Sequence, residues 1–167
     1  MPEIKQNQDF RREFIDTICE LAGKDKNVCL IIPDVGFNYC EKFEERFPDQ
    51  FLNTGVTEAF TTIFATTLAL DGWKPYLYSM INFVLFRPYE MVRNGIVNHK
   101  ANVKLFGVKG SSSYRFLGFS HNLRHDSEDF NVCHNMGLQW ENPKTNEDVR
   151  KVILESYKKE TPLYVRL

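Results

Sequence analysis

The chain has 167 residues, of which 43% are hydrophobic and 14% aromatic, so it is long and apolar enough to bury a core and is no disordered segment. The net charge of −1 and the lack of any basic run exclude the electrostatic signature of a nucleic-acid-binding protein. The N-terminal sequence MPEIKQNQDF lacks the apolar core of a signal peptide, and no apolar run is long enough for a membrane span, which predicts a cytoplasmic protein without a membrane partner.

Hydrophobic spacing predicts helices and strands in alternation along the chain. A first helix is expected over residues 9–21, where Phe10, Phe14, Ile18 and Leu21 recur at helical spacing before Gly23. Further helices are predicted over residues 39–47, from residue 58 onward, over 86–97, and over 146–158 with Asn146 as the cap. Strands are predicted over residues 27–33, 50–53, 74–80, 103–108, 136–140 and 162–167. Residues 109–120 are rich in glycine and serine and are predicted as a loop.

Strands separated by helices are typical of the α/β class. We therefore predict a single three-layer domain over residues 1–167, with a mostly parallel, doubly wound sheet and helices on both faces. Asp34 follows the strand predicted at 27–33, at the carboxyl end, where such sheets gather their ligands. The cysteines are scattered without a Cys-x-x-Cys motif, so reduced structural thiols are expected rather than disulfides or zinc ligands.

The stretch NTGVTEAFTTIFATTLALD, residues 53–71, contains the most informative helix start. Gly55 suits a tight approach from the preceding strand, and Thr57 is a candidate cap. One face of the helix is expected to pack inward through apolar positions at helical spacing, namely Phe60, Ile63, Phe64, Thr67 and Leu68.

Glu58 precedes that apolar face, in the first turn of the helix. The helix N-terminus favours an ionised carboxylate, whereas burial among Phe60, Phe83 and Phe86 would favour the neutral acid. The simpler interpretation is a glutamate that only complements the helix dipole, since acidic residues are common in first turns. Local pattern alone leaves both roles open.

Common catalytic motifs are absent from the sequence. There is no phosphate-binding G-x-x-x-x-G-K-[ST], no dinucleotide-binding G-x-G-x-x-G, no G-x-S-x-G and no zinc-binding H-E-x-x-H. His121 and His125 lie four residues apart, with Asp126 and Asp129 nearby, which leaves a metal site open. Because no third ligand follows at a recognisable distance, we assign no metal ligand.

The run from residue 53 to residue 94 resembles the pyrimidine-binding domain of transketolases and deoxyxylulose-phosphate synthases. The resemblance rests on several short motifs in the family's order: Gly55-Val56-Thr57-Glu58, Leu68-Ala69-Leu70-Asp71-Gly72, Pro75-Tyr76, then Phe83, Phe86 and Tyr89. It extends to Asp34, to the segment from Gly118 to His121, and to the closing Pro162-Leu163-Tyr164-Val165-Arg166. Each motif is short, but together they cover nearly the whole chain.

This resemblance implies that the chain binds thiamine diphosphate. In the family, a glutamate at the position of Glu58 donates a hydrogen bond to the N1′ nitrogen of the aminopyrimidine and so promotes deprotonation of the thiazolium carbon. That role needs a carboxyl group held protonated by desolvation. We assign Phe83, Phe86 and Tyr89 to the pyrimidine pocket and Asp34 to the cofactor site, with ordinary core packing as the alternative for each aromatic ring.

The resemblance also implies substrate contacts. His121 matches the family's substrate-binding histidine and is expected to act in catalysis, and Arg87 lies where the synthases place an arginine against a substrate phosphate. Lys109 stands near a family histidine and is a candidate substrate ligand. Arg11 lies near another anion-binding position, but a surface role is the safer interpretation. Leu117 replaces the aspartate that reads a sugar hydroxyl in transketolases, which argues against the usual aldose acceptor. The loop over residues 111–116 also differs from the acidic, glycine-rich family loop, so a shifted substrate specificity is expected.

The family's Gly-Asp-Gly...Asn segment, which holds Mg²⁺ and diphosphate, is absent from this sequence. We therefore expect a separate diphosphate-binding, N-terminal-type transketolase subunit that supplies the Mg²⁺ site, in a heterotetramer with the active site at the interface. The pair would transfer a two-carbon ketol unit between sugar or sugar-phosphate substrates. The alternatives are a 2-oxo acid decarboxylase or acyloin-forming subunit, a non-catalytic regulatory domain, and a small-molecule-binding module without thiamine.

Overall fold

The computed structural model describes residues 8–110 and 112–167, which form a six-stranded, fully parallel sheet in the order β2-β1-β3-β4-β6-β5. The strands are β1 (Val28–Ile32), β2 (Phe51–Asn53), β3 (Lys74–Met80), β4 (Lys104–Val108), β5 (Gln139–Glu141) and β6 (Leu163–Arg166). The predicted doubly wound α/β fold is confirmed. The chain reverses its direction of travel across the sheet between β1 and β3, and such a switch point opens a crevice at the carboxyl ends of the strands.

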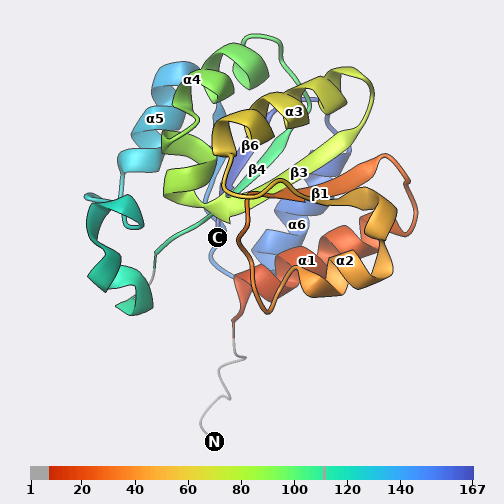
Figure 1. The fold of residues 1–167 in the computed structure, drawn as a ribbon, viewed down its shortest axis with the longest axis horizontal. Helices are drawn as coiled ribbons and strands as arrows, with labels where there is room; N and C mark the ends of the chain where they lie inside the picture. Colours follow the sequence, from red (N-terminus) through yellow and green to blue (C-terminus); the bar gives the residue numbers. More distant parts are fainter. Residues whose placement is uncertain (1–7, 111) are drawn as a thin grey trace, which may run out of the picture.

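Helices cover both faces of the sheet (Figure 1). The α-helices are α1 (Phe10–Ala22), α2 (Glu41–Arg46), α3 (Glu58–Leu70), α4 (Tyr89–Met91), α5 (Glu128–Met136) and α6 (Asn146–Tyr157). Figure 1 shows α1, α2 and α6 on one face and α3, α4 and α5 on the other. Short 3₁₀ segments lie at Pro48–Gln50 and Ser112–Ser120, and π-helical turns lie at Asn82–Phe86 and Val92–Val97.

Each face of the sheet has its own hydrophobic core. Phe14 of α1 is fully buried and stacks on Tyr78 of β3 at a centroid distance of 5.4 Å, in the core beneath α1 and α6. The other core joins Leu77 of β3 to Val92 and Ile96 of the second π-helical segment. The four cysteines are buried and free, as expected, and burial raises the pKa of the Cys29, Cys40 and Cys133 thiols to about 12.

The structure differs from the prediction in several local features, one of which is the 3₁₀ segment Ser112–Ser120 within the predicted loop. Helix α5 was not expected, because its sequence is polar and follows an irregular segment, although Gly137 ends it in the left-handed conformation at φ 76°. The helix predicted over 86–97 begins earlier and consists largely of π-helical turns. Helix α6 is capped by Thr145, not by Asn146: the Thr145 hydroxyl accepts from the Asp148 N–H, and the Asp148 carboxylate accepts from the Thr145 N–H in return.

The face of α3 that was predicted to pack inward is largely the solvent-exposed face. Phe60 and Ile63 are 58% and 46% exposed, and Phe64 and Leu68 are only half-buried. The buried face instead carries Thr61, Thr62, Ala65 and Thr66, and the threonine hydroxyls donate to the carbonyls four residues before them. The helix therefore directs small side chains at its own sheet and large apolar side chains outward.

Candidate functional site

A cleft of ≈ 470 Å³ opens at the carboxyl ends of the strands. Its walls come from the start of α1, the loop after β1, the start of α3, the end of β3 and the segment between β4 and α5. Of the residues predicted from the sequence, the lining includes Asp34, Glu58, Phe83, Arg87 and His121. Side chains separated by up to 110 positions in the sequence, from Arg11 to His121, thus meet in one site.

Glu58 is the first residue of α3, and it is only 6% exposed although it faces the cleft. Gly55 adopts φ 70°, which turns the chain sharply from β2 into the helix. Thr57 occupies the N-cap position but makes no capping bond, because its hydroxyl donates backward to the Thr54 carbonyl at 2.9 Å. Thr57 therefore does not cap the helix with its side chain, contrary to the prediction, but the predicted helix start at Glu58 is confirmed.

Arg87 donates from Nη1 to Oε1 of Glu58 in an ion pair. A protonated Glu58 among aromatic rings was expected from the sequence, whereas the structure places a guanidinium on its carboxylate. Phe60 points away from this carboxylate into solvent, so it does not desolvate it. The glutamate and the arginine lie 29 positions apart in the sequence, and no local pattern joins them.

Phe83 connects the arginine to the predicted histidine. The Arg87 guanidinium lies 4.2 Å from the centroid of the Phe83 ring, and the His121 ring meets the same phenyl group edge-on at 4.9 Å. Glu58, Arg87, Phe83 and His121 consequently form one continuous set of contacts along a wall of the cleft. A ligand in the cleft would meet a carboxylate, a guanidinium, an aromatic ring and an imidazole.

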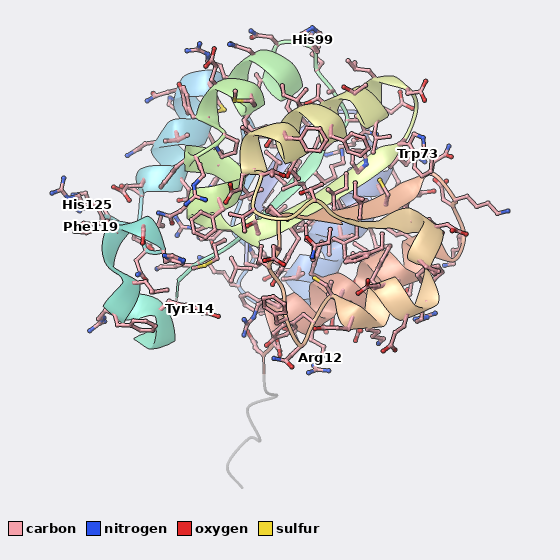
Figure 2. All side chains as sticks on the ribbon, in the orientation of Figure 1. Arg12, Trp73, His99, Tyr114, Phe119 and His125 are labelled. Atoms are coloured by element: carbon pink, nitrogen blue, oxygen red, sulfur yellow. The ribbon has the colours of Figure 1, made fainter. Side chains whose placement is uncertain are left out.

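The segment that carries His121 is held in place by side-chain amides. Asn82 Nδ2 donates to the Phe119 carbonyl at 2.9 Å, and Asn122 Nδ2 donates to the carbonyls of Tyr114 and Gly118, each at 2.8 Å. Tyr114, Phe119 and His125 all come from this segment, which stands beside the sheet (Figure 2). Tyr114 and Leu117 face the cleft, so this segment forms one of its walls.

The opposite wall is built on the loop after β1. Asp34 adopts φ 54°, and its N–H donates to Asn53 Oδ1 at 3.0 Å. Gly36 has φ 94°, and a Cβ there would come within 2.4 Å of Cys40 Sγ, so only glycine fits. Arg11 also faces the cleft, with its guanidinium 4.2 Å from the centroid of the Tyr39 ring. Arg11 therefore belongs to the cleft, although a surface role was the preferred prediction.

Three predicted residues lie elsewhere. Phe86 and Tyr89 are half-buried against the core beneath α3 and do not line the cleft. The helical turn that aims Phe83 at the cleft directs these two rings toward the core, so the structure does not support their assignment to the pocket. Lys109 lines a separate hollow, where its ammonium group forms an ion pair with Asp126.

Sequence reasoning missed a buried polar network beneath this hollow. Asp129 is fully buried and accepts hydrogen bonds from Arg166, from Tyr164 at 2.9 Å and from Trp140 at 3.3 Å. Burial acts to raise the pKa of Asp129, but the hydrogen bonds and charge of Arg166 outweigh it and hold that pKa below its usual range. The network anchors α5 to β6. Two apolar lining residues were also missed, Phe37 and Val56, although they neighbour Asp34 and Glu58 in the sequence.

The described part of the chain contains neither a cluster of metal ligands nor a helix suited to a bilayer. Within residues 8–110 and 112–167, no three or more His, Cys, Asp or Glu side chains gather as a metal site would require. In the same part of the chain, no helix has both the length and the apolar character needed to cross a membrane.

The chain is similar in sequence to transketolases and to related synthases. Residues 6–167 match the family model described as the transketolase pyrimidine binding domain. One subunit of the apulose-4-phosphate transketolase of Phocaeicola vulgatus is 28% identical over 94% of this chain and 50% of its own length. The 1-deoxy-D-xylulose-5-phosphate synthase of Haemophilus influenzae is 27% identical over 99% of this chain and 26% of its own length. The chain thus spans half or less of these relatives.

Solved structures share the fold. A structure described as a split gene transketolase, inactive beta4 tetramer, superposes with a TM-score of 0.82 at 24% identity, over 95% of this chain and 50% of that one. The transketolase of Campylobacter jejuni superposes with a TM-score of 0.78 at 13% identity, over 99% of this chain and 26% of that one.

Proposed function

Because the chain belongs to the transketolase pyrimidine-binding domain family, we propose that it is the pyrimidine-binding subunit of a split transketolase. In this proposal it acts with thiamine diphosphate and transfers a two-carbon ketol unit between sugar-type substrates. The observation that carries the proposal is the position of Glu58, a buried carboxylate at a helix start that faces a cleft at the sheet's switch point. Relatives that are named as single subunits of a transketolase support a two-chain enzyme.

The cleft suits the aminopyrimidine end of the cofactor. Phe83, Val56 and Met80 give it apolar surface against which a flat heterocycle can pack, and Glu58 gives it a carboxyl group for a ring nitrogen. The cofactor, when bound, would supply a carbanion as the nucleophile and a ring that serves as the electron sink for carbon–carbon bond cleavage. Glu58 would hold a proton at the ring nitrogen, and movement of the Arg87 guanidinium away from Oε1 would favour the protonated carboxyl group.

Arg87 and His121 are proposed to meet the substrate. Once it has left Glu58, the Arg87 guanidinium is free to bind a substrate phosphate in a forked geometry. His121 lies against the same phenyl ring and would contact a hydroxyl or carbonyl oxygen near the reacting carbon. Lys109 is not proposed as a substrate ligand, because it lines a separate hollow and not the cleft.

The other half of the site is proposed to come from a partner subunit. A diphosphate with Mg²⁺ needs several oxygen ligands, and residues 8–110 and 112–167 hold no such acidic cluster. The exposed apolar face of α3 adjoins the cleft, since Val56 lines the cleft and lies just before Phe60 and Ile63. Burying this face against a diphosphate-binding subunit would close the cleft and remove apolar surface from water. Two copies of each chain would form a heterotetramer.

Reconstitution tests this function. The chain, its co-purified diphosphate-binding subunit, thiamine diphosphate and Mg²⁺ would be screened against ketose phosphates and 2-oxo acids. Thiamine-dependent ketol transfer only when both chains are present is the expected result. An assembled pair that neither binds thiamine diphosphate nor turns over any of these substrates would overturn the proposal.

A further inference from the structure

Ser120 lies directly before His121 and touches its ring. The Ser120 hydroxyl lies 2.8 Å from the Leu117 carbonyl oxygen and 2.8 Å from His121 Nδ1. A serine hydroxyl has a single hydrogen, and a carbonyl oxygen can only accept. If the hydrogen goes to Leu117, then Ser120 Oγ must accept from His121, and both contacts are satisfied only when Nδ1 carries a proton.

We propose that Ser120 is a positioning residue that holds neutral His121 in the Nδ1–H tautomer. Nε2 is then the ring nitrogen left for the cleft, and it carries a lone pair. Two further contacts fix the position of His121. Phe83 meets the imidazole edge-on, and the His121 backbone N–H donates to the Gly118 carbonyl at 3.3 Å.

The tautomer gives the site a preference among substrates, which rests on the proposed function. An Nε2 lone pair accepts a hydrogen bond from a hydroxyl, and a ketol has a hydroxyl next to its carbonyl. A 2-oxo acid presents a carboxylate there, whose oxygens are acceptors and repel the lone pair. Ser120 thereby favours ketols over 2-oxo acids through His121, without touching substrate.

The tautomer can be read without any cofactor or substrate. Long-range ¹H–¹⁵N correlation on the ¹⁵N-labelled chain distinguishes a protonated ring nitrogen from one that carries a lone pair. The signals lost in His121→Gln identify those of His121. We expect Nδ1–H in the wild type, loss of that preference in Ser120→Ala, and retention in Ser120→Thr, which keeps the hydroxyl. Ser127→Ala is the matched control, an exposed serine from the same part of the chain. An Nε2–H wild type, or an unchanged Ser120→Ala spectrum, overturns the assignment.

The substrate preference is tested in the assembled enzyme. Ser120→Ala should raise KM for a ketose phosphate about five- to tenfold, the effect of one hydrogen bond, while inhibition by pyruvate stays the same or tightens. Ser120→Thr should restore the wild-type KM. An equal loss for ketose and pyruvate would refute the selective role. If the pair has no thiamine-dependent activity at all, the proposed function fails, while the spectra still decide the tautomer.

Discussion

Arg87 Nη1 and Glu58 Oε1 form an ion pair on the wall of the cleft. The arginine side chain is 47% exposed and the glutamate side chain 7%. Arg87 is therefore the partner whose side chain has room to move away from the pair. The pair keeps a buried carboxylate compensated while no ligand is bound, and it ties the substrate-binding role proposed for Arg87 to the release of Glu58.

Replacing Arg87 should weaken substrate binding selectively. Arg87→Ala is expected to lower kcat/KM for phosphorylated substrates about 10- to 100-fold, mainly through KM, because a charged hydrogen-bond donor is lost. Arg93→Ala is the matched control, since Arg93 also lies over a ring, that of Tyr89, but does not line the cleft. Steady-state kinetics with phosphorylated and unphosphorylated substrates measure the effect. Equal losses for both substrate types would show that Arg87 does not bind phosphate.

The outward face of α3 should control assembly and not folding. Phe60→Asp places a charge on a side chain that is 58% exposed, so the free energy of unfolding should change by less than about 0.5 kcal/mol. Association with the diphosphate-binding subunit should weaken more than about tenfold, as expected for an aromatic interface residue. Glu155→Lys, on exposed α6 surface across the sheet, is the control. Light scattering of the mixed chains measures the mass of the complex. If Phe60→Asp forms the same complex as the wild type, the interface lies elsewhere.

The sequence is informative where local pattern and tertiary packing agree. Lys74–Met80 is a strand with the predicted bounds, because a buried parallel strand is apolar along its length. The start of α3 and the place of Asp34 at a strand end also followed from local chemistry. Asp34 and Glu58 both line the cleft at the carboxyl ends of the strands.

The prediction failed where a second element decides the outcome. Helical spacing identified an apolar face on α3 but not the fact that threonines pack against the sheet. The polar helix α5 depends on Asp129, whose hydrogen-bond partners lie on other elements. The Glu58–Arg87 pair is likewise tertiary. In each case the deciding partner is distant in the sequence, so no local window contains it.

Lys104 gives the stability a dependence on alkaline pH. Its side chain is buried, its Nζ donates to the Lys159 and Thr161 carbonyls, and burial lowers its pKa to about 8. Because the unfolded chain, with a lysine pKa near 10.5, binds more protons above pH 8, this group makes the free energy of unfolding rise between about pH 8 and 10. The rise should be about 1–3 kcal/mol, from 1.36 kcal/mol per pKa unit.

Urea unfolding at a series of pH values measures this dependence. Lys104→Met should be less stable at every pH, since two carbonyls lose their donor, and should lack the rise above pH 8. Lys151→Met is the control and should keep the rise above pH 8, because Lys151 is an exposed lysine that lines the same surface hollow as Lys104. Parallel curves for the wild type and Lys104→Met would contradict the account of this lysine.

The role of Glu58 is tested most directly by the exchange rate of the thiazolium proton in the assembled, thiamine-loaded enzyme. Glu58→Gln keeps the shape of the side chain but cannot give or take the proton, so exchange should slow by about 10²- to 10⁴-fold while the subunits still assemble. Glu90→Gln, at an exposed carboxylate on α4, should exchange at the wild-type rate. Wild-type exchange in an intact Glu58→Gln complex would contradict the account.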